Sequence, residues 1–569
     1  MAVNWIGLLS IGVFYVMVLG LGIWASRKSK REEQKCTAKR SEVAMVGGRN
    51  LNIWVSIFTM TATWVGGGYI MGTAEIVYDP TKGLVWAVGP PAFCLNLLIG
   101  AVFLVKPIRA KNYVTIMDPF QEKYGNTIAA ILFIPALIAD ILWVACILGA
   151  LGKDVKLVVM DINSTLSVAI SAAVAIVYTL MGGLYSVAYT DVIQLIFMFL
   201  GLWVCVPFIL MSPFAANVTI AAVTKWNQEP WLGKVQLEDS GNWIDDFLLL
   251  VIGGICYQAL YQRILSTATD TQAKITLFAG SILCVVLGVP SILIGAVAAS
   301  TDWNQTSFGS PSPFEQGKSG MILPIALQYL CPFYVSLFAM GALAAAVMSS
   351  VDSALLSAAS ELGRNIFKNI IYKKASEKHI LVTVKASILL CGLLGAGLAM
   401  TSSSISLFWI FSCDVLYSLM SAQVMCILFL PNRVNHCGAC TGFVVGLLLR
   451  ALVGEPILGI PDILPLPWDK IQEDGHRRRL FPFRTAIMLI SFAAILVTSH
   501  FMAWLCEKGV LKMNLHVATD SIGVNHQGSM NNKDDEVPDR ELVPLSSQSR
   551  NEEGNSCFSG NGDILRDSS

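Results

Sequence analysis

The chain has 569 residues, of which 54% are hydrophobic and 14% are charged, and its mean hydropathy is +0.62. This composition excludes a soluble globular protein and predicts an all-α polytopic membrane protein embedded in a lipid bilayer. The formal net charge is zero, so no partnership with nucleic acid is expected. The sequence has no Ser/His/Asp set, zinc-protease motif or phosphate-binding loop, and we do not expect an enzyme.

The first apolar run covers residues 5–25 and is followed by the basic segment RKSKREEQKCTAKR. Basic segments beside a span stay in the cytoplasm, so the N-terminus is predicted to lie outside the cell. A cleaved signal peptide has basic residues before its apolar run, so this run is predicted to be a retained helix. Apolar stretches of about 20 residues recur as far as Leu505 and predict roughly thirteen spans, with a cytoplasmic C-terminus. The basic run HRRRL (476–480) falls on the predicted outer side, against this rule.

The second predicted span has three consecutive glycines at its middle, in TATWVGGGYIMG (residues 61–72). Each glycine weakens a helix by about 1 kcal/mol relative to alanine, so the span is expected to break there. The seventh span carries a similar pair, Gly253 and Gly254. Glycine pairs also permit close helix packing. Breaks at matching positions, five spans apart, favour a transporter built from two inverted five-helix repeats with discontinuous helices.

A broken helix leaves backbone carbonyls without partners inside the membrane, which is costly unless they bind something. The carbonyls of Ala62 and Val65 stand immediately before the glycines. The ninth span, GALAAAVMSSVDSALLSAAS, offers hydroxyls at Ser349 and Ser350, and its small residues permit close approach. Oxygen ligands of this kind suit a sodium ion. The alternative is that each serine bonds only the carbonyl four residues before it.

Several aspartates fall within or at the edge of predicted spans, where a carboxylate is costly and usually functional. A role in coupling is predicted for Asp191, Asp245 and Asp352. For those near a span end, a solvated helix cap is the alternative. The other carboxylates of this kind are Asp140, Asp246 and Asp414.

Four aromatic residues lie away from the predicted span ends, at depths that could face one cavity: Trp64, Phe93, Trp143 and Tyr257. Rings in spans often serve core packing or anchor a helix at the interface. If they converge on a cavity, they would suit a quaternary ammonium ion, which has no N–H to donate and is attracted to ring faces.

Two further features lie outside the spans. The polar connection STDWNQTSFGSPSPFEQGKSG carries a glycosylation sequon at Asn304, which the topology places outside the cell. The segment 506–569 is rich in Ser, Asn, Asp and Glu and predicts a disordered cytoplasmic tail. Trafficking proteins are possible partners of such a tail, and the sequence leaves the oligomeric state open.

Over about residues 1–505 the chain resembles the sodium/solute symporter family, and most of all its choline-transporting members. The resemblance is carried by TATWVGGGYI, MDPFQEKYG, GGLYSVAYTDVIQL, STDWNQT, ILPIALQYLCP and AAVMSSVDS. It implies a first helix with a basic loop (1–48), a ten-helix inverted-repeat transport core (49–430) and two additional C-terminal helices (431–505).

The resemblance also implies site residues. A sodium ion would be held by carbonyls of Ala62, Val65 and Ala346 and hydroxyls of Ser349 and Ser350, with Asp191 linked to sodium coupling. The four aromatic residues would form the choline cage, but two differ from the pattern: Phe93 stands where tyrosine is expected, and Tyr257 replaces tryptophan in GGICYQ. Tyrosine attracts a cation less strongly than tryptophan.

The resemblance therefore implies sodium-coupled, chloride-dependent, high-affinity uptake of choline across the plasma membrane. It further implies a supply for acetylcholine synthesis and a location in presynaptic terminals and synaptic vesicles. The altered cage leaves a second hypothesis, a sodium-coupled symporter of another small amine or organic solute.

Overall fold

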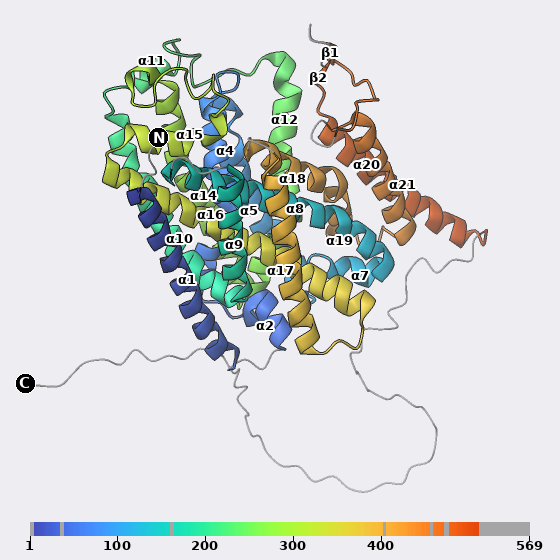
Figure 1. Cartoon of the computed structure of the whole chain (residues 1–569). Coiled ribbons are helices and arrows are strands. Elements are labelled where there is room, and N and C mark those ends of the chain that lie inside the picture. Colours follow the sequence, from blue (N-terminus) through green and yellow to red (C-terminus); the bar gives the residue numbers. More distant parts are fainter. Residues whose placement is uncertain are drawn as a thin grey trace, which may run out of the picture. The chain divides into compact units, whose positions relative to one another are not determined.

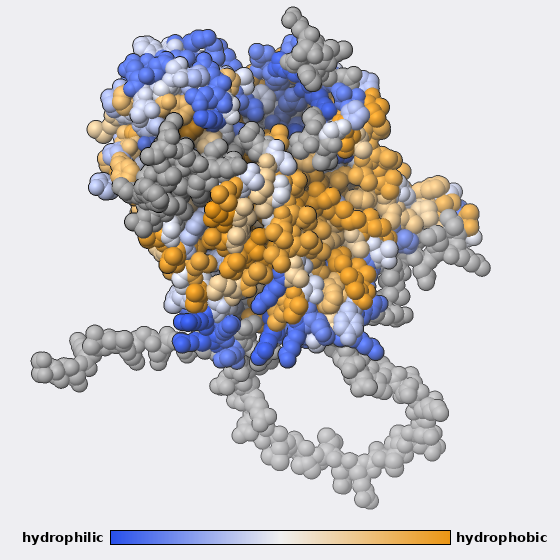
Figure 2. All heavy atoms as spheres, viewed as in Figure 1, coloured by the Kyte–Doolittle hydropathy of each residue, from blue (hydrophilic) through white to orange (hydrophobic). Residues whose placement is uncertain are grey.

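The structure, a computed structural model, describes residues 5–34, 39–159, 164–401, 405–455, 459–471 and 477–510. These residues form a bundle of helices around a large apolar core. Figure 2 shows a broad apolar band between two polar ends, as expected for a bundle held in a bilayer. The all-helical membrane fold predicted from composition is confirmed. Nearly all of the predicted tail, from residue 511 on, lies outside the described residues.

The helices follow one another along the chain, with the longer connections before α12, α15 and α21 (Figure 1). They are α1 (Trp5–Glu33), α2 (Arg40–Val46), α3 (Ile53–Trp64), α4 (Gly67–Tyr78), α5 (Gly89–Ile99), α6 (Val105–Arg109), α7 (Asp118–Tyr124), α8 (Asn126–Val159), α9 (Ser164–Leu180), α10 (Leu184–Leu210), α11 (Val218–Ala221), α12 (Ser240–Leu248), α13 (Gln258–Ser266), α14 (Asp270–Ala299), α15 (Ile322–Leu330), α16 (Phe333–Glu361), α17 (Glu377–Ala399), α18 (Ile405–Leu419), α19 (Ser421–Phe429), α20 (His436–Val453) and α21 (Phe483–Glu507).

Short segments of tighter or wider helix join these elements. The 3-10 turns are η1 (Gly47–Arg49), η2 (Leu84–Trp86), η4 (Leu237–Asp239), η6 (Gly254–Cys256), η7 (Trp303–Gln305) and η8 (Ser319–Met321). The π-helices are η3 (Gly100–Leu104), η5 (Leu249–Gly253) and η9 (Leu362–Ile371). Two short strands, β1 (Lys470–Ile471) and β2 (Arg477–Arg478), pair antiparallel.

By length and composition, 8 helices of the described residues can cross a membrane, or up to 10 if each bent pair counts as one span. The sequence predicted more because it counted apolar stretches whether or not a single helix covers them. α3 and α4 have 12 residues each, and α9 has 17, so each is too short to qualify alone. The predicted second span is divided between α3 and α4.

The predicted break in the second span is present between α3 and α4. The backbone leaves the helical region at Val65 (φ −89°, ψ 72°) and is extended at Gly66 (φ −109°, ψ −168°). A Cβ on Gly66 would lie 1.9 Å from the Ser350 hydroxyl oxygen, and one on Gly67 would lie 2.7 Å from a methyl group of Val347. The glycines therefore let α16 pack directly against the break.

The second predicted break is also present, between α12 and α13. The chain passes from α12 into the π-helix η5 and the 3-10 turn η6, and it leaves the helical region at Tyr257 (φ −71°, ψ 129°). The two helical parts differ in direction by 52°. π-helical segments inside helices occur frequently at functional sites.

The bundle has two polar ends. The α7 end carries α2, α7 and η9, and the α11 end carries α11, η7 and the strand pair (Figure 1). Two basic residues of the strand pair form ion pairs with η4, the turn before α12: Arg478 contacts Asp239 at 2.7 Å and Lys470 contacts Glu238 at 2.6 Å. Within HRRRL, Arg478 is thus paired with an acidic residue, and Arg479 donates to the Val453 carbonyl at 2.7 Å.

Candidate solute and ion site

The four aromatic residues predicted from the sequence come together around Trp64. The centroid of its ring lies 5.2 Å from that of Phe93, 6.2 Å from Trp143 and 6.0 Å from Tyr257. Trp143 and Tyr257 are 4.9 Å apart. The rings come from the end of α3, from α5, from α8 and from the break before α13, so both broken spans contribute to one ring cluster.

Two further rings, Tyr69 and Trp409, belong to this ring cluster and were missed from the sequence. Tyr69 stacks on Phe93 with centroids 5.5 Å apart and an interplanar angle of 13°, and Trp409 meets Phe93 edge-on at 5.7 Å. Tyr69 directly follows the three glycines, so its position next to the predicted break could have identified it as a site residue. Trp409 lies in an ordinary apolar stretch of α18, and nothing in its sequence context marks it.

The ring cluster is closed in this conformation. It surrounds a cavity of about 10 Å³, lined by the six rings together with Gly66, Gly68 and Cys413. A cavity needs roughly 10–15 Å³ to hold one water molecule, so a solute enters only if the rings separate. The Tyr257 hydroxyl contacts Ser412, which donates to the Ala139 carbonyl at 2.7 Å. The indole N–H of Trp64 is buried and has no partner among the described residues.

Oxygen atoms from α3 and α16 converge beside the ring cluster. The hydroxyls of Ser349 and Ser350 both lie 3.2 Å from the Ala62 carbonyl, and Ser349 also donates to the Ala346 carbonyl at 2.9 Å. We call these four groups the oxygen cluster. Val65 stands at the break itself, and no described residue donates to its carbonyl. An arrangement of oxygen atoms alone suits a hard monovalent cation.

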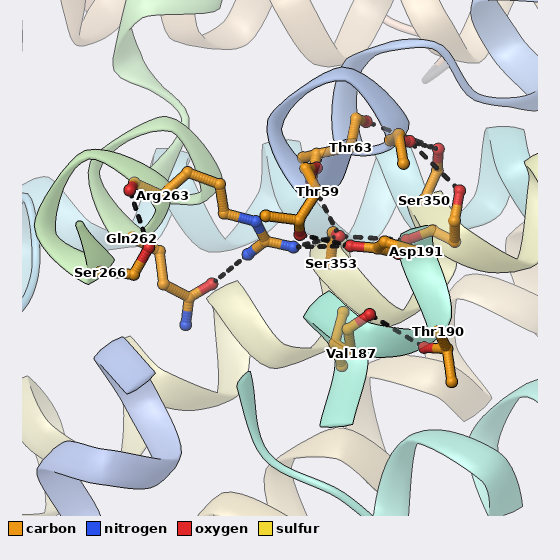
Figure 3. A network of polar contacts seen from close by, with 12 residues as sticks. Thr59, Thr63, Val187, Thr190, Asp191, Gln262, Arg263, Ser266, Ser350 and Ser353 are labelled. Carbon is orange, nitrogen blue, oxygen red and sulfur yellow. Dashed lines mark hydrogen bonds and ion pairs between the residues drawn. The ribbon is translucent and has the colours of Figure 1, made fainter. Parts of the chain in front are cut away.

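Asp191 lies in a buried polar network next to the oxygen cluster (Figure 3). It accepts a hydrogen bond from Thr59 of α3 and pairs with Arg263 of α13, whose nitrogen lies 3.7 Å away. Arg263 also donates to Ser353 of α16, and Ser353 lies 3.1 Å from the Thr63 hydroxyl. The network thus joins α10, α3, α13 and α16. Arg263 is fully buried, and the sequence analysis did not select it.

The two other predicted coupling carboxylates have different surroundings. Asp352 is buried on α16 and accepts from Thr179 of α9 at 2.7 Å. Asp245 lies where α12 meets α21: it accepts from the backbone N–H of Thr485 at 2.7 Å and from that of Arg484 at 3.1 Å. Asp245 therefore caps the first turn of α21. This matches the helix-cap alternative, except that the capped helix is a neighbouring one.

The predicted glycosylation residue, Asn304, is exposed in η7 at the α11 end. Its backbone N–H donates to Asp302 at 3.2 Å, and the sequon hydroxyl of Thr306 donates to Trp303 at 2.7 Å. The side chain is thus accessible, and glycosylation of Asn304 stays a prediction.

Comparison with solved structures establishes the fold. The chain matches a Na⁺-coupled sialic acid symporter, solved in a substrate-bound outward-open state, with a TM-score of 0.68 over 88% of this chain and 98% of that one. The two sequences are 17% identical. The inverted-repeat fold of sodium-coupled transporters, predicted from the paired breaks, is confirmed.

Comparison of sequences identifies the family. The chain is 44% identical over 520 residues to the human high affinity choline transporter 1, covering 91% of this chain and 89% of that protein. It is 43% identical over 537 residues to the Torpedo marmorata high-affinity choline transporter 1, covering 94% and 91%. The sequence model of the Sodium:solute symporter family matches residues 45–446. The chain is therefore a transporter rather than an enzyme, and it belongs to the sodium:solute symporter family.

Proposed function

We propose that this protein is a sodium-coupled symporter that carries choline into the cell across the plasma membrane. The observation that carries the proposal is the place of Trp64. Its ring is at the centre of the ring cluster, while Ala62, two residues before it, supplies a carbonyl to the oxygen cluster. A solute site and an ion site thus share one broken helix. The relatives named as choline transporters support choline as the solute.

The chemistry of the ring cluster supports a quaternary ammonium solute. No residue that lines its cavity carries a charge. A primary amine in such a place would leave its N–H donors without partners, which is costly in a buried site. The trimethylammonium group of choline has no N–H and is attracted to ring faces within about 6 Å. Sugars need many hydrogen bonds, and these rings offer few.

The geometry also supports a coupling mechanism. A sodium ion held by the Ala62 and Ala346 carbonyls and the hydroxyls of Ser349 and Ser350, with the free carbonyl of Val65, would fix the end of α3 against α16. This would orient Trp64 for the solute, so sodium and choline stabilise the same conformation. By thermodynamic linkage, each then raises the affinity for the other by the same factor. Rocking of the bundle exposes both to the cytoplasm.

Radiolabelled choline uptake into cells that express the chain tests this function. External sodium is replaced by an impermeant cation in one arm and chloride by an inert anion in another. Saturable uptake that disappears without sodium is expected. Surface-expressed protein that moves no choline under any gradient would refute the proposal, and a screen of other amines would then test the second hypothesis.

We place the N-terminus and the α11 end outside the cell and the α7 end in the cytoplasm, in line with the charge pattern. Asn304 is then glycosylated. Treatment with an N-glycosidase is expected to increase the electrophoretic mobility of the wild type and to leave Asn304→Gln unchanged. A wild-type protein that is insensitive to the enzyme in a glycosylating host would contradict this assignment.

Tyr257 is expected to limit the affinity for choline. Tryptophan is a better face for a cation than tyrosine, so Tyr257→Trp should lower the KM for choline about threefold. The indole cannot reproduce the hydroxyl contact with Ser412, so Tyr257→Phe is the matched control that removes this contact without enlarging the ring. Uptake titrations with choline provide the measurement. An unchanged KM in Tyr257→Trp would indicate that this ring does not face the solute.

The remaining proposals rest on the resemblance to choline transporters. They are a ten-helix transport core at 49–430, dependence on chloride, supply of choline for acetylcholine synthesis, and location in presynaptic terminals and synaptic vesicles. Trafficking proteins at the tail belong with them.

A further inference from the structure

Eight acidic side chains are buried in the part of the chain that the structure describes, and six of them face an arginine. Asp118 faces Arg364, Asp239 faces Arg478, Asp245 and Asp414 face Arg484, and Asp191 and Asp352 lie near Arg263. The two exceptions are Asp140 and Glu361. Neither takes part in an ion pair with a described residue.

Asp140 lies on α8, one turn before Trp143 of the ring cluster. Its side chain is 3% exposed, and one carboxyl oxygen has no hydrogen-bond partner among the described residues. Tyr257, Cys391 of α17 and Glu361 are within electrostatic range of it. Asp140 therefore lies within electrostatic range of the ring cluster, through Tyr257, and of Glu361.

Glu361 is the last residue of α16 before the π-helix η9. Its side chain is 0% exposed, and both carboxyl oxygens lack a hydrogen-bond partner among the described residues. The charged groups that act on it are Asp140 and Asp118, both acidic. Burying a carboxyl group without any partner is costly, so a purely structural role does not explain this residue.

The order of these groups along the bundle follows from how α8 and α16 pack. Asn126 at the start of α8 donates to the Asn369 carbonyl of η9, while Ala150 near the other end lies beside Val347. The helices therefore run antiparallel. At 1.5 Å per residue along α8, Asp140 lies about 21 Å from the α7 end and Glu361 about 8 Å nearer to that end.

Asp118 continues this series at the α7 end itself. Although burial favours its neutral form, the Arg364 guanidinium holds the pKa of Asp118 below its ordinary value. Arg364 contacts it at 3.1 Å, and Asn365 donates to it at 2.9 Å. The carboxyl groups thus descend from the ring cluster to the cytoplasmic end in the order Asp140, Glu361, Asp118, and only the last is neutralised.

We propose that Asp140 and Glu361 form a transient binding site for a monovalent cation on its way to the cytoplasm, which we call the exit station. The cation is the quaternary ammonium head of the departing solute. The station rests on the proposed function, since it needs a cationic cargo. Opening of the α7 end admits water, which allows the two carboxyl groups to carry negative charge at low cost. The departing cation then moves from ring faces to carboxylates, rather than directly from a preorganised site into bulk water.

The test compares the two faces of the transporter in oriented membrane vesicles. Asp140→Asn and Glu361→Gln are expected to raise the KM for choline about fivefold at the cytoplasmic face, because each removes one cation partner. The KM at the external face should stay within about twofold, since choline and sodium that arrive from outside bind to the ring cluster and the oxygen cluster. Asp140→Glu and Glu361→Asp keep the carboxylate and should restore the cytoplasmic KM.

Glu122→Gln is the matched control, because Glu122 lies at the same end but is paired with Lys111 at 2.6 Å. It should leave the cytoplasmic KM unchanged. Unchanged kinetics in both station variants, or equal changes at the two faces, would overturn the station. If the variants instead alter only the internal sodium requirement, the site serves sodium and the assignment to the solute is wrong. A wild type that moves no choline would refute the proposed function, and the station for choline with it.

Discussion

Ser350→Ala is expected to raise the sodium concentration for half-maximal choline uptake about tenfold or more, by analogy with the loss of groups around other metal sites. The hydroxyl lies 3.2 Å from the Ala62 carbonyl, so its removal takes away one of the four oxygen atoms of the oxygen cluster between α3 and α16. Alanine is smaller than serine, and Gly66 leaves room for it, so no steric clash is introduced. Sodium titration of choline uptake, normalised to surface protein, provides the measurement.

Ser336→Ala is the control for this experiment. Ser336 is a buried serine of the same helix, near its start and away from the oxygen cluster. Its sodium titration should match that of the wild type. If Ser350→Ala also titrates like the wild type, the oxygen cluster does not bind the coupled ion.

Arg263→Met is expected to destabilise the protein by about 3 to 5 kcal/mol, because it leaves Asp191 as an uncompensated buried charge. Arg263 is fully buried and its nearest carboxylate oxygen lies 3.7 Å away. The thermal unfolding of the purified protein in detergent should show a large drop in Tm. A Tm close to that of the wild type would contradict the account of the buried pair.

The double variant Asp191→Asn/Arg263→Met separates the stability role of the pair from its role in coupling. Removing both charges should restore most of the lost stability, since no unpaired charge remains. If Asp191 also serves coupling, the restored protein still has a weakened sodium dependence of uptake. Full recovery of both properties would assign the pair to stability alone.

Features that depend on local backbone chemistry or on position within a span could be predicted from the sequence. Each of three consecutive glycines weakens a helix by about 1 kcal/mol relative to alanine, so a break close to Gly66 could be predicted from local chemistry. The serine pair on α16 could be selected because the small residues around it permit another helix to approach closely. The four predicted rings could be selected by depth in their spans, and the structure does bring them together around Trp64.

Features that depend on packing between distant helices were not predictable. Trp409 joins the ring cluster because α18 packs against α4 and α8, and no local sequence pattern predicts this packing. Arg263 lies on α13 beyond the second break, and its partner Asp191 lies 72 residues earlier on another helix. The partner of Asp245 is the start of α21, 240 residues later, so the sequence could not separate a cap from a coupling group.

The most direct test of the central claim measures the binding of each ligand to the purified protein in the presence and absence of the other. The dissociation constant for choline is determined with and without sodium, and that for sodium with and without choline. The shared break that follows Trp64 predicts that each ligand tightens the binding of the other by the same factor. Choline that binds with equal affinity in the presence and absence of sodium would contradict the coupling of the ring cluster to the oxygen cluster.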